Sequence, residues 1–191
     1  LRVHALRATI EALRTHVFNN VIWPNFESIP SAEAPFVSFH DIAVGQMLHL
    51  GSREPKLVEV LPAVHTVPAC GFAVRRAEGG AHWVFSGDTE RNAPFWERVN
   101  AIDVAMLVIE TAFSSREQAL AERSLHLSPA VLADELTHIE PGKQYPIYIT
   151  HTKPAETDEI MSQIEALAVE QVAGLAQRDI RWLKADGVLT F

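Results

Sequence analysis

Four short apolar runs in this sequence each lead into a side chain that can ligate a metal ion or transfer a proton. These side chains are two imidazoles and two carboxylates, at His65, Asp88, Glu110 and His151. Imidazole and carboxylate together suit zinc, manganese or iron, and one carboxylate can bridge the two cations of a paired-metal site. Because ligands bind where strands end along one edge of a layered sheet, we expect the four side chains to converge.

A fifth candidate, His126, stands just before the pair Ser128–Pro129, which predicts the start of a helix. Each candidate taken alone also fits an ordinary structural role. A histidine beside a strand or helix is often a packed or surface residue, Asp88 suits a turn in its Ser-Gly-Asp-Thr context, and Glu110 suits a solvated strand end. The placement of all five at element boundaries favours a functional role, because random placement would seldom produce it.

The other six of the nine histidines do not share this placement, and we interpret them as structural or surface residues: His4, His16, His40, His49, His82 and His138. Cys70 is interpreted as a small core residue rather than a nucleophile. The sequence has no Cys-x-x-Cys motif, Walker loop or dinucleotide-binding fingerprint, and Gly79-Gly80 reads as a turn.

The elements that must position the five candidates follow from periodicity and turn residues. Helices are predicted over residues 4–18, from Asn92, from Ser128–Pro129 and from Thr157. Strands are predicted near residues 36–44, 56–64, 72–76, 82–85, 104–109, 146–150 and 187–191. Strands come first and then alternate with helices, an order that predicts a layered α/β domain.

Length and composition narrow the class of protein. The 191 residues suit one domain or a large part of one. Sixteen basic and 24 acidic residues give a formal net charge of −8, which argues against a broad nucleic-acid-binding face. No apolar run reaches the roughly 20 residues needed to span a bilayer. The single cysteine leaves the compartment open, and the start at Leu1 leads us to expect a piece of a longer protein.

Five segments together resemble the metallo-β-lactamase fold and, within it, the class II 3′,5′-cyclic-nucleotide phosphodiesterases. These segments are His65–Pro68, Phe85–Thr89, Ile109–Phe113, His126–Pro129 and Ile149–Pro154. Residues 9–13 and 18–24 fit the same group. The Ser-Gly-Asp-Thr element is shared with the wider superfamily, whereas Asn-Asn-x-Ile-Trp-Pro and Thr-His-x-Lys-Pro favour the phosphodiesterases.

The resemblance implies an α/β fold, the metallo-β-lactamase-like αβ/βα sandwich with its N-terminal strands missing. His65 matches the third histidine ligand of the first metal, Asp88 the carboxylate that bridges both metals, and His151 the terminal histidine ligand of the second. Glu110 and His126 match a catalytic Glu–His pair that is also seen in tRNase Z enzymes. There the histidine protonates the leaving oxygen and the acidic residue orients it.

One part of the family pattern is absent, namely the His-x-His-x-Asp-His ligand cluster. We therefore expect residues 1–191 to form a single incomplete domain, the larger C-terminal part of the whole. For the complete enzyme the resemblance implies two divalent metal ions, zinc first, with manganese and iron as alternatives. A metal-bridging hydroxide would hydrolyse a cyclic nucleotide, cAMP or cGMP, to the 5′-nucleotide. No nucleic acid or membrane partner is expected, and a homodimer is left open.

Two other functions compete with this one. A metallo-nuclease of the tRNase Z type shares the same ligands and the Glu–His pair. A chain without the His-x-His cluster could also be a degenerate, non-catalytic binding domain. Metal content and the choice of substrate separate the three.

Overall fold

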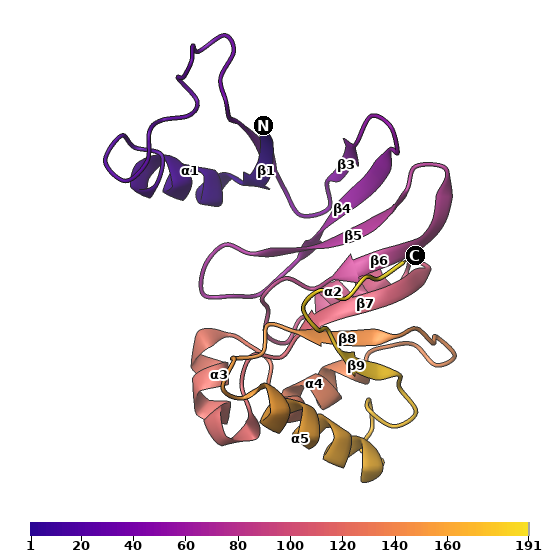
Figure 1. Ribbon diagram of the computed structural model, residues 1–191. Coiled ribbons are helices and arrows are strands. Elements are labelled where there is room, and N and C mark those ends of the chain that lie inside the picture. Colours follow the sequence, from indigo (N-terminus) through magenta and orange to yellow (C-terminus); the bar gives the residue numbers. More distant parts are fainter. Residues whose placement is uncertain (191) are drawn as a thin grey trace. The chain divides into compact units, whose positions relative to one another are not determined.

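The computed structural model describes residues 1–190, which divide into two compact units (Figure 1). The first unit is Leu1–Gln46 and the second begins at Met47. All five candidate residues lie in the second unit, so its topology decides the site.

The first unit pairs two parallel strands beside one helix. Its elements are β1 (Arg2–Leu6), α1 (Arg7–His16) and β2 (Ser38–Ile42). The prediction of a helix over residues 4–18 is therefore wrong at its start, because residues 2–6 pair with β2, which lies more than 30 residues away in the sequence. Helical periodicity in a local window does not reveal such a long-range pairing.

The second unit is built on a seven-stranded sheet whose spatial order follows the sequence from β3 to β9. Its strands are β3 (Met47–Leu50), β4 (Lys56–Pro62), β5 (Cys70–Arg76), β6 (Gly79–Phe85), β7 (Val104–Glu110), β8 (Ile147–Thr150) and β9 (Ile180–Trp182). Strands β3 to β6 pair antiparallel, and β6 to β9 pair parallel. The hairpin predicted at Gly79-Gly80 is confirmed.

Helices connect the parallel strands, as parallel pairing requires. They are α2 (Ala93–Asn100), α3 (Gln118–Ser124), α4 (Pro129–Leu136) and α5 (Thr157–Val169), with a short 3₁₀ turn at Ser115–Glu117. One core joins the sheet to α2, α4 and α5, and its fully buried members include Leu107, Ile147, Phe95, Leu132 and Ile160. The layered α/β domain predicted from the element order is confirmed.

Helix α2 begins as the sequence indicated, whereas α4 begins differently. The Asn92 side chain caps α2 by accepting a hydrogen bond from the Phe95 N–H. Ser128 precedes α4 but makes no side-chain cap, because its hydroxyl donates to Gln118 instead. A tertiary partner has displaced the local hydrogen bond that the sequence favoured.

The last predicted strand is also wrong. Residues 187–190 form no strand, and Phe191 lies outside the described residues. The final strand is instead β9, which extends the parallel sheet beside β8. Within residues 1–190, no helix combines the length and the apolar character needed to cross a membrane.

Candidate active site

The site lies at one edge of the sheet because four strands run in the same direction. Strands β6, β7 and β8 are parallel, and β4 has the same direction because two antiparallel pairings separate it from β6. Their C-terminal ends lead to Asp88, Glu110, His151 and His65 respectively. A hydrogen bond joins the loops that follow β4 and β6, because the Val64 N–H donates to the Thr89 hydroxyl at 2.9 Å. The predicted convergence at one edge is confirmed.

At the centre of the site, His126 and Glu110 form a buried pair. His126 Nδ1 lies 2.7 Å from Glu110 Oε1, and the two side chains are 8% and 0% exposed. The carboxylate oxygen accepts, so Nδ1 carries the proton, and Nε2 is the imidazole nitrogen left for other chemistry. Glu110 is thus not a solvated strand end, and His126 does more than pack beside a helix.

The Glu110 carboxylate also holds three loops. Its Oε1 accepts the backbone N–H of Thr89 at 3.0 Å in addition to His126. Its Oε2 accepts the N–H groups of Ala112 at 3.1 Å and Leu127 at 3.3 Å. These four donors fill the acceptor sites of an ionised carboxylate, so Glu110 is fixed and in turn fixes the imidazole of His126.

His65 and His151 flank the His126 ring. The centroid of the His126 ring lies 4.6 Å from that of His65 and 5.2 Å from that of His151. His65 Nδ1 lies 3.3 Å from the Leu125 carbonyl oxygen. A carbonyl only accepts, so Nδ1 of His65 is the protonated nitrogen and Nε2 keeps its lone pair. Metal-binding histidines commonly have this arrangement.

Asp88 completes the group beside His151. Its Oδ2 lies 3.6 Å from His151 Nε2, and both side chains are more than one-third exposed. A capping residue would hydrogen-bond to its own turn. In the described part of the chain, the Asp88 carboxylate makes no such hydrogen bond. The carboxylate and imidazole are therefore open to an incoming ligand or ion.

Left-handed backbone angles occur where the chain leaves the strands and helices that carry these residues. Leu125, at the end of α3, and His151, after β8, both have left-handed φ angles, of 56° and 60°. Such angles cost free energy in residues other than glycine and cluster at functional sites. Gly87, just before Asp88, has φ +66°, and a Cβ atom there would lie 2.4 Å from the Cys70 carbonyl oxygen.

Replacing Gly87 with alanine is expected to destabilise the protein more than the same change at Gly142. Both glycines have positive φ, but a Cβ at Gly142 meets no atom within 4 Å. The left-handed backbone alone costs about 1–2 kcal/mol for an alanine, and only Gly87 adds the collision with Cys70. The free energy of unfolding in urea measures both variants, and equal losses would refute the steric argument.

The described residues do not by themselves fit a paired-metal centre. Across residues 1–190, no group of three or more His, Cys, Asp or Glu side chains is arranged to hold a metal ion. His65, Asp88 and His151 are three side chains, whereas one catalytic zinc ion alone takes about three protein ligands, so two ions need more than these. They can form part of a ligand set only.

Two residues near His126 were missed as site residues by sequence reasoning. The Phe113 ring packs edge-on against His126 with centroids 5.6 Å apart. The Lys153 ammonium lies 4.9 Å from the centre of the Phe113 ring. Both residues stand inside segments that carried the family resemblance, which was the available signal.

Cys70 is not the small core residue that the sequence predicted. It is half-buried at the start of β5. Burial raises the pKa of its thiol above the usual value, which disfavours the reactive thiolate.

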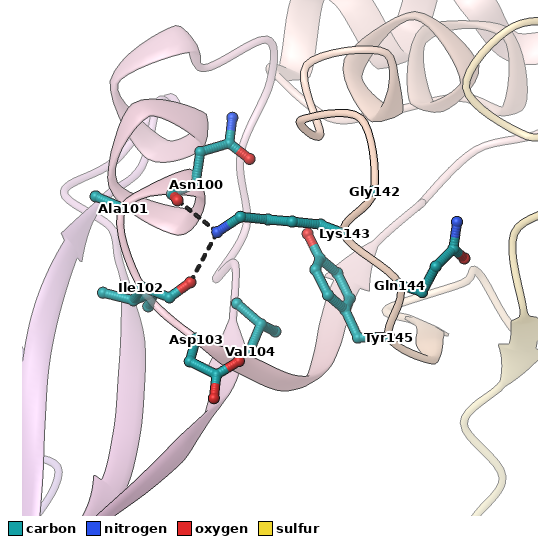
Figure 2. Close-up of a pocket in the computed structure, with 9 residues that line it drawn as sticks. All are labelled: Asn100, Ala101, Ile102, Asp103, Val104, Gly142, Lys143, Gln144 and Tyr145. Atoms are coloured by element: carbon teal, nitrogen blue, oxygen red, sulfur yellow. Dashed lines mark hydrogen bonds between the residues drawn. The ribbon is translucent and has the colours of Figure 1, made fainter.

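A cavity of about 480 Å³ lies away from these residues, between the loops that lead into β7 and β8. Figure 2 shows Lys143 reaching across it to the carbonyl oxygens of Asn100 and Ile102, the latter at 2.9 Å. Because strands β7 and β8 start at this edge and end at the other, the cavity is not part of the candidate site.

Comparison with known proteins relates the N-terminal third of the chain to one family. Residues 2–67 match the family model described as cAMP phosphodiesterases class-II. A comparison with curated protein sequences found no match. The segment matched includes His65 but ends before the other four candidate residues.

Solved structures show the same fold. The chain superposes on unliganded yeast PDE1 with a TM-score of 0.76 and 19% identity, covering 95% of this chain and 56% of that one. For the short form of human tRNase Z, ELAC1, the TM-score is 0.61 and the identity 13%, covering 99% and 67%. For Zn²⁺-bound PqqB of Methylobacterium extorquens the TM-score is 0.57 and the identity 15%, covering 100% and 62%.

The chain therefore spans little more than half of yeast PDE1 and about two thirds of the other two structures. These structural likenesses establish the metallo-β-lactamase-like α/β fold, and the sequence match to the phosphodiesterase family covers residues 2–67. Residues 2–67 thus match the class-II cAMP phosphodiesterase family, and the chain as a whole shares the metallo-β-lactamase-like fold.

Proposed function

We propose that the site serves the hydrolysis of a 3′,5′-cyclic nucleotide, with cAMP or cGMP as substrate and the 5′-nucleotide as product. The family match supports the substrate class. The observation that carries the reaction is the buried Glu110–His126 pair, with Nδ1 of His126 bound to the carboxylate at 2.7 Å. The proposal concerns the complete protein, because this chain spans 56% of yeast PDE1.

His126 acts as the general acid in this reaction. Hydrolysis to the 5′-nucleotide breaks the bond between phosphorus and the ribose 3′ oxygen, while a water oxygen bonds to phosphorus and loses a proton to the solvent. The departing oxygen takes the proton of Nε2 of an imidazolium, which Glu110 stabilises through Nδ1. Proton transfer from a positioned acid is worth about 10²- to 10⁴-fold in rate.

We also propose His65, Asp88 and His151 as ligands of divalent metal, zinc first, with manganese and iron as alternatives. The zinc in PqqB shows that a protein of this fold binds that ion. The lone pair on His65 Nε2 and the open Asp88–His151 pair suit the role. Since the described residues provide too few ligands for a complete site, further side chains must join them.

The fold that this chain shares with human tRNase Z is consistent with the nuclease alternative. However, the match of residues 2–67 to phosphodiesterases and the net charge of −8 favour a small cyclic nucleotide as the substrate. The direct test offers the natural protein cAMP, cGMP and precursor tRNA in parallel. Formation of 5′-AMP or 5′-GMP supports the proposal. Cleavage of tRNA alone favours the nuclease, and no turnover together with no bound metal favours a non-catalytic domain.

Replacing Asp88 or His151 with alanine is expected to lower both the bound divalent metal and the turnover of cAMP. Changing even an outer partner of a metal ligand costs about 10- to 100-fold, so a true ligand should cost at least that. Elemental analysis and product chromatography measure the two effects. His16→Ala, an exposed histidine at the end of α1, is the control. Unchanged metal content in both site variants would overturn the ligand roles.

A further inference from the structure

Lys153 belongs to the Thr-His-x-Lys-Pro segment after β8, and the proposed function gives it no role. Its backbone is fixed, because the Lys153 N–H donates to the Ala112 carbonyl at 3.1 Å. Its side chain extends over the ring of Phe113, with Nζ 4.9 Å from the ring centre. Both contacts attach Lys153 to the segment that directly follows Glu110.

Phe113 connects this ammonium to the proton donor. The ring is buried, with 6% exposed, and packs edge-on against His126. A cation over an aromatic face is attracted by the ring without using its N–H donors. Lys153 is therefore held one ring away from His126 with its hydrogen-bonding capacity intact.

The neighbouring charges do not neutralise Lys153. Within residues 1–190, no carboxylate lies within ion-pair distance of its ammonium. Glu156 is close in sequence, and its pKa is lowered chiefly by the hydrogen bond that its carboxylate accepts from the Ser114 N–H at 2.9 Å and to a smaller extent by the charges of Arg116 and Lys153, with which it forms no ion pair. The neighbouring cation Arg116 is engaged by Glu159 at 3.2 Å. Lys153 is thus an available positive charge beside a site whose own carboxylates are at Asp88 and Glu110.

We infer that Lys153 binds a non-bridging phosphoryl oxygen of the substrate and holds phosphorus beside His126. The inference rests on the proposed function, because it takes a phosphodiester as the ligand. Lysine is a common phosphate-binding residue that acts as a point charge. A cation at the site also attracts an anionic substrate toward a chain whose net charge is −8.

The test compares Lys153→Met, Lys153→Arg and Lys56→Met in the natural protein. Methionine keeps an apolar stem over Phe113, so the fold should persist, and arginine keeps the charge. Lys56→Met is the control. Lys56 lies at the start of β4, where it pairs with Glu54, so this variant loses the same charge at the opposite edge of the sheet. Calorimetry measures the Kd for 5′-AMP and for inorganic phosphate, and steady-state kinetics measures the KM and kcat for cAMP.

Lys153→Met is expected to weaken binding of 5′-AMP and phosphate, and to raise the KM for cAMP, by about tenfold or more, the range of a hydrogen bond to a charged group. The kcat should change less, and Lys153→Arg should recover most of the binding. The inference is overturned if Lys153→Met binds as tightly as Lys56→Met. It is also overturned if the unaltered protein does not bind phosphate. If binding depends on Lys153 but cAMP is not hydrolysed, the inference stands and the proposed function fails.

Discussion

Replacing His126 with alanine is expected to lower the kcat for cAMP hydrolysis by about 10²- to 10⁴-fold while the fold is kept. Glu110 holds the imidazole of His126 in place through a hydrogen bond of 2.7 Å. Without it, the ribose 3′ oxygen must leave as an alkoxide or take a proton from water. The KM should change much less, because the proton is delivered only in the transition state.

The substrate offers a sharper test than the size of the loss. Bis(p-nitrophenyl) phosphate releases a nitrophenolate, which leaves readily without protonation. His126→Ala should therefore lose far less activity on this ester than on cAMP. His138→Ala, a half-exposed histidine beyond α4, should leave both rates unchanged. Equal losses on the two substrates would show that His126 does not act as the acid.

Replacing Glu110 with alanine is expected to lower the free energy of unfolding by about 3 kcal/mol or more. The carboxylate is fully buried and accepts three backbone N–H groups as well as His126. Ala112 keeps a second acceptor, the Leu127 carbonyl, but the N–H groups of Thr89 and Leu127 lose theirs. Each buried donor left unsatisfied costs about 1–3 kcal/mol, and breaking a buried charged pair adds to this.

Unfolding in urea, followed by tryptophan fluorescence, measures this loss. Glu97→Ala removes the same side chain from an exposed position on α2, and should change stability by no more than about 0.5 kcal/mol. Asp88→Ala should also be tolerated, because that carboxylate is more than one-third exposed. A Glu110→Ala variant as stable as Glu97→Ala would mean that Glu110 does not hold the loops together.

The location of the site was predictable because it follows from strand ends. An apolar run that stops at a polar side chain marks both the strand and the residue at its edge, which located His65, Glu110 and His151. The parallel order of β6 to β8 then brings such ends together. The roles of these residues as ligands and acid remain predictions, since placement alone does not test them.

What the sequence could not reveal depends on contacts between distant segments. The pairing of β1 with β2 overrides the helical pattern of residues 4–6. Ser128 donates to Gln118 rather than to its own helix. Lys153 has significance only through Phe113, which lies forty residues away by sequence number. None of these partners can be identified from local periodicity.

The junction at Glu110 also limits how this site can diversify in evolution. Loops that follow strands usually tolerate insertions and carry changes of specificity. Here the backbone N–H groups of Thr89, Ala112 and Leu127 come from three different loops and meet at one carboxylate. An insertion beside any of them would withdraw a donor and release His126. New substrate preferences are therefore easier to acquire in segments that do not bind Glu110.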